Sequence, residues 1–442
     1  MKTETHIPGP LDRKHHAVFV WCRVWLERVA LLFLEFLPRT FDILLSLALI
    51  VALSPVLFVR GIVAKWRTGK VFNSAELIGR FRMPFRRLGF AGDAPGAGLA
   101  VLFNILHGEM AFAGPRPMTE SELMRLTPEQ GIRFTCRPGV FSPYLLRRKV
   151  GIAYDSEQMS DIDFFYSETV QGDMGLIARS VIGGMLAGGG LRPAPPTLHF
   201  FGIDVANTTM DEAVDWIVRR IRDKQLAQIA FVNPDCLNIA FRHGQYKQVL
   251  KGSARVLPDG IGIHLGCRLL GVSLLANVNG TDLFPRLCAR AATEGLSLFL
   301  LGAGPGVAEA VSRNMRERYP ALVIAGVRDG YFPPEQSGQV VDDINASNAD
   351  ILLVALGAPK QELWLAEHHD RLKPCVRLGV GGLFDFYSGR LPRAPLWMRE
   401  IGLEWTWRLL QEPGRMWRRY LIGNPLFLYR VWLQKRKGDD LQ

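Results

Sequence analysis

The sequence of 442 residues is poor in the groups that build disulfide frameworks and zinc sites. It has only six cysteines, and no two of them form a Cys-x-x-Cys pair. Small disulfide-rich domains and zinc sites need closely spaced cysteines, so neither is expected. The cysteines therefore predict a reducing compartment and no metal centre.

Charged residues are also scarce, at 21%, whereas hydrophobic residues make up 48% of the chain and the mean hydropathy is +0.09. This composition excludes a disordered chain and is slightly too apolar for an ordinary cytosolic enzyme. We therefore expect part of the protein to contact lipid. The length predicts two or three domains.

The net charge of +11 is concentrated near the C-terminal end. Residues 390–442 contain eleven Arg and Lys against five Asp and Glu, and five of the ten tryptophans. Such a segment suits either nucleic acid or an anionic membrane surface, and the apolar run described next favours the membrane. Four of its tryptophans are expected at the bilayer surface: Trp397, Trp405, Trp407 and Trp417. The alternative is an amphipathic helix that packs on its own domain.

Residues 41–59 form the only long apolar run, close to the roughly 20 residues that cross a bilayer. Asp42 lies at its start, Ser54 and Pro55 interrupt it near its end, and basic residues flank both sides. Proline removes a helix hydrogen bond, and basic residues favour the cytosolic side. We therefore expect a helix-break-helix hairpin that enters and leaves one leaflet, with a kinked transmembrane helix as the alternative. Residues 1–38 are expected to form an amphipathic, basic segment.

The N-terminal third carries motifs in the order seen in one family of membrane enzymes. They are Arg39-x-x-Asp42, Ser54-Pro55, Gly79-Arg80, Pro84-Phe85, Asn104-x-x-x-Gly108-Glu109-Met110, Gly114-Pro115-Arg116-Pro117 and Arg137-Pro138-Gly139. Residues 39–186 thus resemble the monotopic bacterial sugar transferases, which attach a sugar phosphate to polyprenyl phosphate. The resemblance implies a mainly helical, membrane-associated domain with a re-entrant motif made by Arg39, Asp42, Ser54 and Pro55.

The Asp-Glu dyad that this family needs for catalysis is missing. Counting back from Gly114 without gaps places Ala97 and Gly98 at the dyad, and neither residue can carry a phosphate or transfer a proton. We expect a domain that keeps the membrane fold without the transfer chemistry. The triplet Asp161-Ile162-Asp163 imitates a metal-binding motif but is expected to be a solvated helix start.

A linker rich in Gly and Pro, residues 187–198, is expected to separate this domain from the next. Thr209 and Glu212 then form a capping box that opens a helix. Six apolar runs alternate with helical patterns from there on, at 227–232, 254–257, 297–301, 321–326, 350–356 and 375–380. Strands that are apolar throughout are covered on both faces, so we predict an α/β domain with a Rossmann-like parallel sheet.

Ligands bind beyond the carboxyl ends of such strands, where this sequence has polar or glycine-rich turns. Asn233-Pro234-Asp235 and Pro258-Asp259-Gly260 follow the first two runs, and each turn alone would be an ordinary cap or turn signal. The loop Gly302–Gly306 follows the third and could receive a diphosphate on its backbone N–H groups. Gly357–Glu362 and Gly381–Asp385 follow the last two runs, and five such turns on one edge are harder to explain as turns alone.

Together these turns resemble the WecG/TagA/CpsF glycosyltransferases over residues 199–430. The motifs are Asn233-Pro234-Asp235, Leu257–Gly262, Gly280-Thr281-Asp282, Gly302–Gly306, Asp329–Phe332, Gly357–Glu362 and Arg393-Ala394-Pro395. The resemblance implies a catalytic domain at 199–390 that moves a sugar from a UDP-sugar donor onto a polyprenyl-diphosphate-linked sugar. It also implies inversion at the anomeric carbon, with no metal and no cofactor.

The same resemblance assigns the site residues. It makes Asp259 the general base, which suits a carboxylate that takes the proton of an acceptor hydroxyl. The residues implied in substrate binding are Asn233, Asp235, Gly302, Gly304, Gly306, Gln361, Arg408, Arg415 and Arg418. The three arginines lie in an appendage, residues 391–442, that is expected to associate with the membrane. Phe231 and Asn277 depart from the threonine and arginine usual in the family.

The sequence thus predicts a membrane-associated glycosyltransferase of exopolysaccharide or cell-envelope glycan biosynthesis. Its donor sugar would be of the N-acetylmannosamine type or a uronic acid. We expect it at the cytoplasmic face of the bacterial inner membrane, in contact with lipid, with no nucleic-acid partner, and associated with other polysaccharide-assembly enzymes. Three alternatives stay open: a bifunctional enzyme that also primes polyprenyl phosphate, a NAD-dependent sugar oxidoreductase that uses Gly302–Gly306, and an inactive assembly scaffold.

Overall fold

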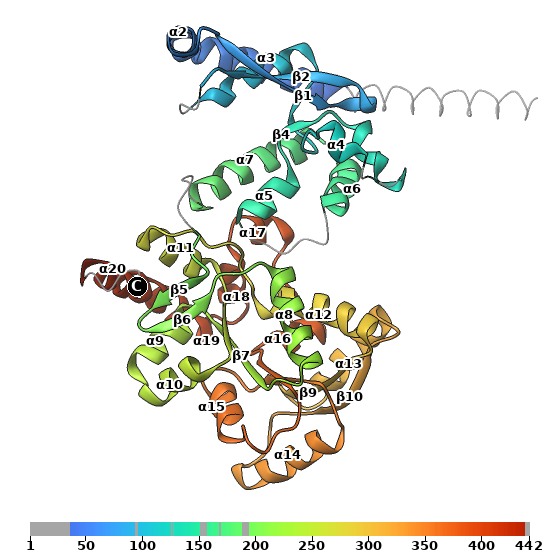
Figure 1. The fold of residues 1–442 in the computed structure, drawn as a ribbon, viewed down its shortest axis with the longest axis vertical. Helices are drawn as coiled ribbons and strands as arrows, with labels where there is room; N and C mark the ends of the chain where they lie inside the picture. Colours follow the sequence, from blue (N-terminus) through green and yellow to red (C-terminus); the bar gives the residue numbers. More distant parts are fainter. Residues whose placement is uncertain are drawn as a thin grey trace, which may run out of the picture. The chain divides into compact units, whose positions relative to one another are not determined.

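A computed structural model describes residues 36–92, 96–124, 126, 128–150, 157–167, 169–187 and 194–437 (Figure 1). Most of the predicted N-terminal segment and residues 188–193 of the predicted linker lie outside this part. The chain divides into two compact units. Unit 1 runs to Leu146 and includes Tyr154–Ser180, whereas unit 2 consists of Arg147–Ala153 and Val181–Gln442.

The N-terminal part of the chain combines short helices with two small sheets. Strands β1 and β2 pair antiparallel, and β3 and β4 pair parallel. In chain order the elements are a first helix Phe36–Ala52, α2 Ser54–Thr68, β1 Phe72–Ile78, η1 Arg80–Arg82, β2 Pro84–Phe90, η2 Ala97–Ala100, α3 Val101–His107, β3 Ala111–Ala113, α4 Glu120–Leu123, η3 Pro128–Thr135, β4 Gly139–Phe141, α5 Pro143–Val150, α6 Glu157–Ser167 and α7 Val170–Ala187.

The apolar run is a bent helix pair, as its proline predicted. The first helix and α2 meet at an angle of 71°, and Pro55 lies in the first turn of α2, where a missing N–H costs no hydrogen bond. No single described helix is long and apolar enough to cross a membrane, whereas this pair passes that test of length and composition together. The predicted break is therefore confirmed.

Two residues of the predicted re-entrant motif tie the first helix to the rest of unit 1. The guanidinium of Arg39 donates to the carbonyls of Ile105 and Leu106 at 2.7 and 2.9 Å, which satisfies the last turn of α3. The buried carboxylate of Asp42 accepts from the backbone N–H of Phe112 at 3.1 Å. Ser54 donates to the carbonyl of Val51 at the bend. These residues thus have a structural role that the sequence did not reveal.

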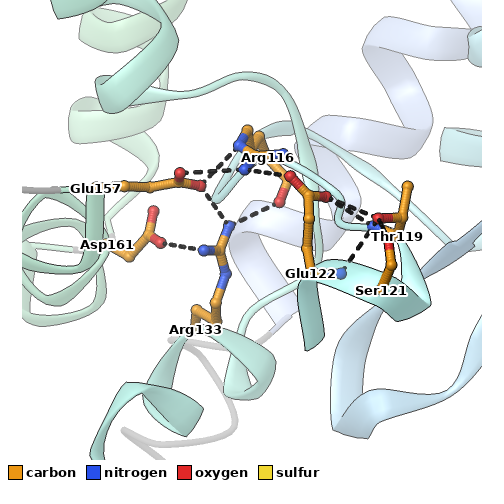
Figure 2. A network of polar contacts seen from close by, with 7 residues as sticks. All are labelled: Arg116, Thr119, Ser121, Glu122, Arg133, Glu157 and Asp161. Carbon is orange, nitrogen blue, oxygen red and sulfur yellow. Dashed lines mark hydrogen bonds and ion pairs between the residues drawn. The ribbon is translucent and has the colours of Figure 1, made fainter. Parts of the chain in front are cut away.

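A partly buried network of ion pairs joins loops and helices of unit 1 (Figure 2). Glu157 on α6 accepts from Arg116 at 2.7 Å and from Arg133 at 3.0 Å. One turn later on α6, Asp161 pairs with Arg133 at 3.2 Å and is 1% exposed. The expectation that Asp161 begins a solvated helix is therefore wrong, because Asp161 is packed in the interior beside Arg133, while Asp163 is exposed.

Unit 2 is built on a six-stranded parallel sheet with strand order β10-β9-β11-β12-β7-β8. Each of the six predicted apolar runs forms one of these strands, which confirms the predicted parallel sheet. The strands are β7 Ala227–Val232, β8 Arg255–Pro258, β9 Ser297–Gly302, β10 Val323–Arg328, β11 Ile351–Ala355 and β12 Val376–Gly379. A hairpin of β5 Thr197–Phe200 and β6 Ile203–Ala206, which the sequence did not predict, precedes them.

Helices cover both faces of this sheet (Figure 1). Successive residues of each strand enter different apolar clusters: Ile229 and Leu300 face one side, whereas Ala230 and Leu301 face the other. Burial on both faces explains why the strands are apolar throughout. The helices are α8 Met210–Arg222, α9 Pro234–Arg242, α10 Gly244–Gly252, α11 Ile261–Leu270, α12 Gly280–Glu294, α13 Val307–Arg318, η4 Pro334–Gln336, α14 Ser337–Ala346, α15 Lys360–Glu367 and α16 Leu383–Tyr387. The predicted capping box of Thr209 and Glu212 opens α8.

The last segment of the chain folds back onto unit 2. Its elements are α17 Leu396–Glu400, α18 Glu404–Gln411, α19 Pro413–Trp417, the π-helical turn η5 Arg418–Ile422 and α20 Gly423–Lys437. Phe427 and Val431 of α20 are fully buried against the cluster that contains Phe200. One side of α20 is therefore held by its own domain, while Tyr429 and Trp432 remain exposed.

Candidate active site

A cavity of about 200 Å³ opens at the carboxyl ends of β7 and β8, the edge at which a parallel sheet binds its ligands. Its walls come from the turns after these strands, from α11 and α12, and from the segment that follows the sheet. The residues that matter below are Asn233, Asp235, Asp259, Gly260, Asn277, Asp282, Phe386, Glu404, Trp405, Arg408, Arg419 and Tyr420. The structure thus brings together Asn233, Asp235, Asp259 and Arg408 from the predicted site.

Asn233 is held by the helix that it caps. Its side-chain oxygen accepts the backbone N–H groups of Asp235 and Cys236, both at 3.1 Å, so it satisfies the first turn of α9. The amide group of Asn233 then remains for a hydrogen bond to the carboxylate of Asp259. Capping and site geometry therefore depend on the same side chain.

Asp259 lies in a turn whose backbone is fixed on both sides. Its N–H donates to the carbonyl of Val232 at 2.9 Å, and the next N–H, that of Gly260, donates to the side chain of Asn277 at 2.7 Å. Gly260 has a φ of 91°, a conformation that favours glycine. Asn277 therefore supports the turn that carries Asp259.

Burial raises the pKa of Asp259 above its ordinary value, because the charged form loses hydration. Three partners oppose this shift: the positive charge of Arg419, the hydrogen bond from Asn233 and the positive charge of Arg408. A carboxylate with a raised pKa that still borders a cavity is suited to accept a proton near neutral pH.

The arginines at the cavity are not the set that the sequence predicted. Arg408 lines the cavity with its guanidinium 5.1 Å from the ring centre of Phe386, and Arg419 lies 3.6 Å from Asp235. Arg415 and Arg418 are not among the described residues that line the cavity; the Arg418 guanidinium lies over the ring of Trp417. Sequence reasoning missed Arg419, for which only its position next to Arg418 gave a signal.

Gln361 is not among the described residues that line the cavity, and it joins two loops. Its side-chain oxygen accepts the N–H of Gly357 at 3.1 Å and that of Gly381 at 2.9 Å, and its amide donates to Glu362 at 2.7 Å. The side chain is 3% exposed. Gln361 therefore positions the loops after β11 and β12, and its predicted contact with substrate stays a prediction.

The glycine loop Gly302–Gly306 lies at the same edge of the sheet but further along it. Two strands, β11 and β12, separate β9 from β7, so the loop lies roughly 14 Å from Asn233 at the usual strand spacing. A Cβ atom on Gly302 would lie 2.6 Å from the backbone of Ala355, so close packing between the two strands requires glycine at this position. Gly302, Gly304 and Gly306 are not among the described lining residues, and their predicted role in diphosphate binding stays a prediction.

Within the described residues, no group of three or more His, Cys, Asp or Glu could hold a metal ion. Burial raises the pKa of the Cys236 thiol, next to the site, to about 12. Four arginines (Arg148, Arg399, Arg408 and Arg419) and Lys149 line the cavity, and the charges of Arg408 and Arg419 act on the Asp259 carboxylate. A carboxylate beside such cations can take a proton, and the cations can stabilise an anionic leaving group.

Residues 198–440, more than half of the chain, match the glycosyl transferase WecG/TagA/CpsF family. The chain belongs to this family. It is a glycosyltransferase, and its parallel sheet is consistent with the Rossmann-like fold that the resemblance implied. The matched segment lies within unit 2 and contains every residue of the cavity named above.

Relatives in this family carry a common name, N-acetylglucosaminyldiphosphoundecaprenol N-acetyl-beta-D-mannosaminyltransferase. The protein of Bacillus subtilis (strain 168) is 34% identical over 226 residues, which cover 51% of this chain and 86% of the relative. That of Bacillus spizizenii is 38% identical over 211 residues, 48% of this chain and 80% of the relative. That of Staphylococcus aureus (strain MW2) is 31% identical over 242 residues, 54% and 94% respectively.

Proposed function

We propose that this glycosyltransferase moves a sugar from a UDP-sugar donor to a sugar linked to polyprenyl diphosphate, with Asp259 as the general base. The observation that carries the proposal is the position of this carboxylate, which borders a cavity that Arg408 and Arg419 also line. The names of the relatives support the acceptor, since each describes a diphosphoundecaprenol-linked sugar.

In this mechanism the acceptor hydroxyl attacks the anomeric carbon of the donor while Asp259 takes its proton. The bond from that carbon to the diphosphate oxygen breaks, and UDP leaves with the bonding electrons. Attack opposite the leaving group inverts the anomeric carbon. Arg408 and Arg419 stabilise the negative charge that develops on the diphosphate, and this makes UDP a better leaving group.

We infer that the donor sugar is N-acetylmannosamine and the acceptor sugar N-acetylglucosamine. The support is the shared name of relatives at 31% to 38% identity. Asn277, which supports the turn of Asp259 instead of offering a cation, and the buried ring of Phe231 are departures through which donor contacts could differ.

Unit 1 is proposed as a membrane anchor that has lost phosphoglycosyl transfer. Apolar side chains of the bent pair are exposed, among them Val51, Phe58 and Trp66 at 66%, 71% and 84%. Ala97 and Gly98, which stand where the dyad would be, lie in η2. Anchoring at the cytoplasmic face of the inner membrane, beside other assembly enzymes, would raise the effective concentration of a lipid-linked acceptor.

The function is tested with the full chain in detergent, a panel of UDP-sugars and a short-chain polyprenyl-diphosphate-linked N-acetylglucosamine. Mass spectrometry should detect one added sugar, and Asp259→Asn should lower kcat about 1,000-fold or more, in the range of lost general base catalysis. An unchanged rate for Asp259→Asn would remove this residue from the mechanism.

A second assay separates the proposal from a bifunctional enzyme. Radiolabelled UDP-sugar is incubated with bare polyprenyl phosphate, and no labelled lipid is expected because the dyad is missing. Labelled lipid would establish priming by unit 1.

Flotation of the chain with anionic vesicles tests the membrane anchor. A Phe58→Glu/Trp66→Glu double variant should float less than the wild type, and equal flotation would contradict the role of the bent pair.

A further inference from the structure

We infer that Trp405, supported by Tyr420, is the wall on which the pyranose ring of a substrate stacks. The inference rests on the proposed function, because it assigns a sugar subsite within the same cavity. Both aromatic side chains line the cavity together with Asp259. Trp405 was expected at the bilayer surface, and its place in the cavity gives it a different role.

The two rings come from different elements and meet at the cavity. Trp405 lies in the first turn of α18 and Tyr420 in the π-helical turn η5. Their ring centres are 5.8 Å apart with an interplanar angle of 57°, within the range of favourable aromatic pairs. Each ring therefore limits the rotamers of the other.

Each ring also comes directly after a charged residue whose ion pairs lead to an aspartate that lines the cavity. Glu404, just before Trp405, accepts from Arg393 at 3.2 Å, and Arg393 also donates to Asp282 on α12 at 2.5 Å. Arg419, just before Tyr420, pairs with Asp235. These contacts hold both aromatic residues in place before a ligand binds, which reduces the entropy lost on binding.

Aromatic faces at the cavity differ in how far they are already covered. The guanidinium of Arg408 lies over Phe386 at 5.1 Å, and that of Arg419 lies 5.6 Å from the ring centre of Tyr420. Among the described residues, no cation lies over Trp405, so its ring is not covered by a guanidinium as those of Phe386 and Tyr420 are. Trp405 is therefore the ring that we assign to the sugar, and Tyr420 packs beside it as its support.

A pyranose ring has both an apolar face and polar groups, and this cavity offers an aromatic surface and a polar one. Its axial C–H groups form an apolar face that packs on an aromatic ring, while its hydroxyl groups need polar partners. The same cavity offers such polar partners, because Asn233 and Asp259 also line it. The sugar could belong to the donor or to the acceptor, since both carry the same ring chemistry.

The experiment compares ligands that differ by the sugar alone. The Kd of UDP and of UDP-N-acetylmannosamine is measured by calorimetry for the full chain, and the KM of the short-chain N-acetylglucosaminyl acceptor is measured by transfer. Trp405→Leu should raise the value for one sugar ligand about three- to tenfold, the size of an aromatic contact, and leave the Kd of UDP within about twofold. Trp405→Phe should recover most of the loss, and Tyr420→Leu should show a smaller change of the same kind.

Trp432→Leu is the matched control, because Trp432 stacks on Tyr429 at 6.0 Å on α20 away from the lining of the cavity. It should leave all three values unchanged. A rise for UDP-N-acetylmannosamine assigns the wall to the donor, and a rise for the acceptor assigns it to the acceptor. Equal weakening of UDP, or no change with either sugar ligand, overturns the inference. If the wild-type chain transfers no sugar but Trp405→Leu still weakens UDP-N-acetylmannosamine relative to UDP, the proposed function fails and the sugar wall stands.

Discussion

Asn233 holds the carboxylate of Asp259 with the amide that remains after its oxygen has capped α9. A single side chain thus links the start of a helix to the proposed base. The hydrogen bond lowers the pKa of Asp259, against the raising effect of burial. Because a general base must be ionised, we expect this contact to keep the enzyme active at lower pH.

Asn233→Asp should shift the acid limb of the kcat/KM profile to higher pH by about one unit. Aspartate still caps a helix, so α9 should persist, but a second carboxylate replaces the donor and further raises the pKa of Asp259. Activity should therefore fall more at pH 6 than at pH 8.5. Asn233→Ser, which keeps a cap and adds no charge, should give a smaller shift. A loss of equal size at both pH values would contradict this electrostatic role.

Arg419→Gln should shift the same acid limb in the same direction. The positive charge of Arg419 is the largest of the effects that lower the pKa of Asp259, so its removal raises that pKa. We expect kcat/KM to fall about tenfold or more at pH 6, with part of the loss persisting at high pH because the diphosphate loses a cation. Arg418→Gln is the comparison, and we expect a smaller loss, since Arg418 lies over Trp417. Equal losses would contradict the assignment.

The parts that sequence could predict are those set by local pattern. The runs at 227–232 and 350–356 became β7 and β11 because strands buried on both faces must be apolar throughout. Pro55 predicted the bend at α2 for an equally local reason. Asp259 and Asn233 could be placed together because the carboxyl ends of parallel strands share one edge.

The parts that sequence could not predict depend on register and tertiary contact. Arg408, Arg415 and Arg418 have the spacing of a helical face, but α18 ends at Gln411 and η5 is a π-helical turn. The backbone leaves the helical conformation at Glu412, so Arg415, Arg418 and Arg419 no longer keep the helical phase of Arg408, and Arg419 and not Arg418 lines the cavity. The role of Gln361 was hidden for another reason, since its partners Gly357 and Gly381 follow two different strands.

Gln361→Leu should destabilise unit 2 by about 2 kcal/mol. Leucine fills a similar volume, but it leaves the N–H groups of Gly357 and Gly381 without their acceptor. The melting temperature of the full chain, measured with and without UDP, should fall in both states. Lys360→Leu, an exposed neighbour, should have no such effect. A normal melting temperature together with weaker substrate binding would instead support direct contact of Gln361 with substrate.

Asp161→Asn should remove a pH dependence from the stability of unit 1. Burial raises the pKa of Asp161 from 3.8 to about 7, since the positive charge of Arg133 offsets only part of the lost hydration. A carboxyl whose pKa is raised by folding contributes stability below its unfolded value, and this contribution is lost as pH rises to about 7. The variant should therefore be more stable than the wild type at pH 8 and lose that advantage near pH 4.

Amide hydrogen exchange in α6 of the full chain, compared between variant and wild type at each pH, measures this difference. Glu157→Gln is the matched control on the same helix, because Glu157 accepts from both Arg116 and Arg133. Removing that charge leaves two arginines short of a partner, so this variant should be less stable than the wild type at pH 8, on the order of 2 kcal/mol. If Asp161→Asn stabilises α6 at pH 8 and Glu157→Gln destabilises it, the network needs the charge of Glu157 and not that of Asp161. If Asp161→Asn destabilised α6 at pH 8 as Glu157→Gln does, the pair with Arg133 would outweigh the cost of burial, and the raised pKa of Asp161 would be wrong.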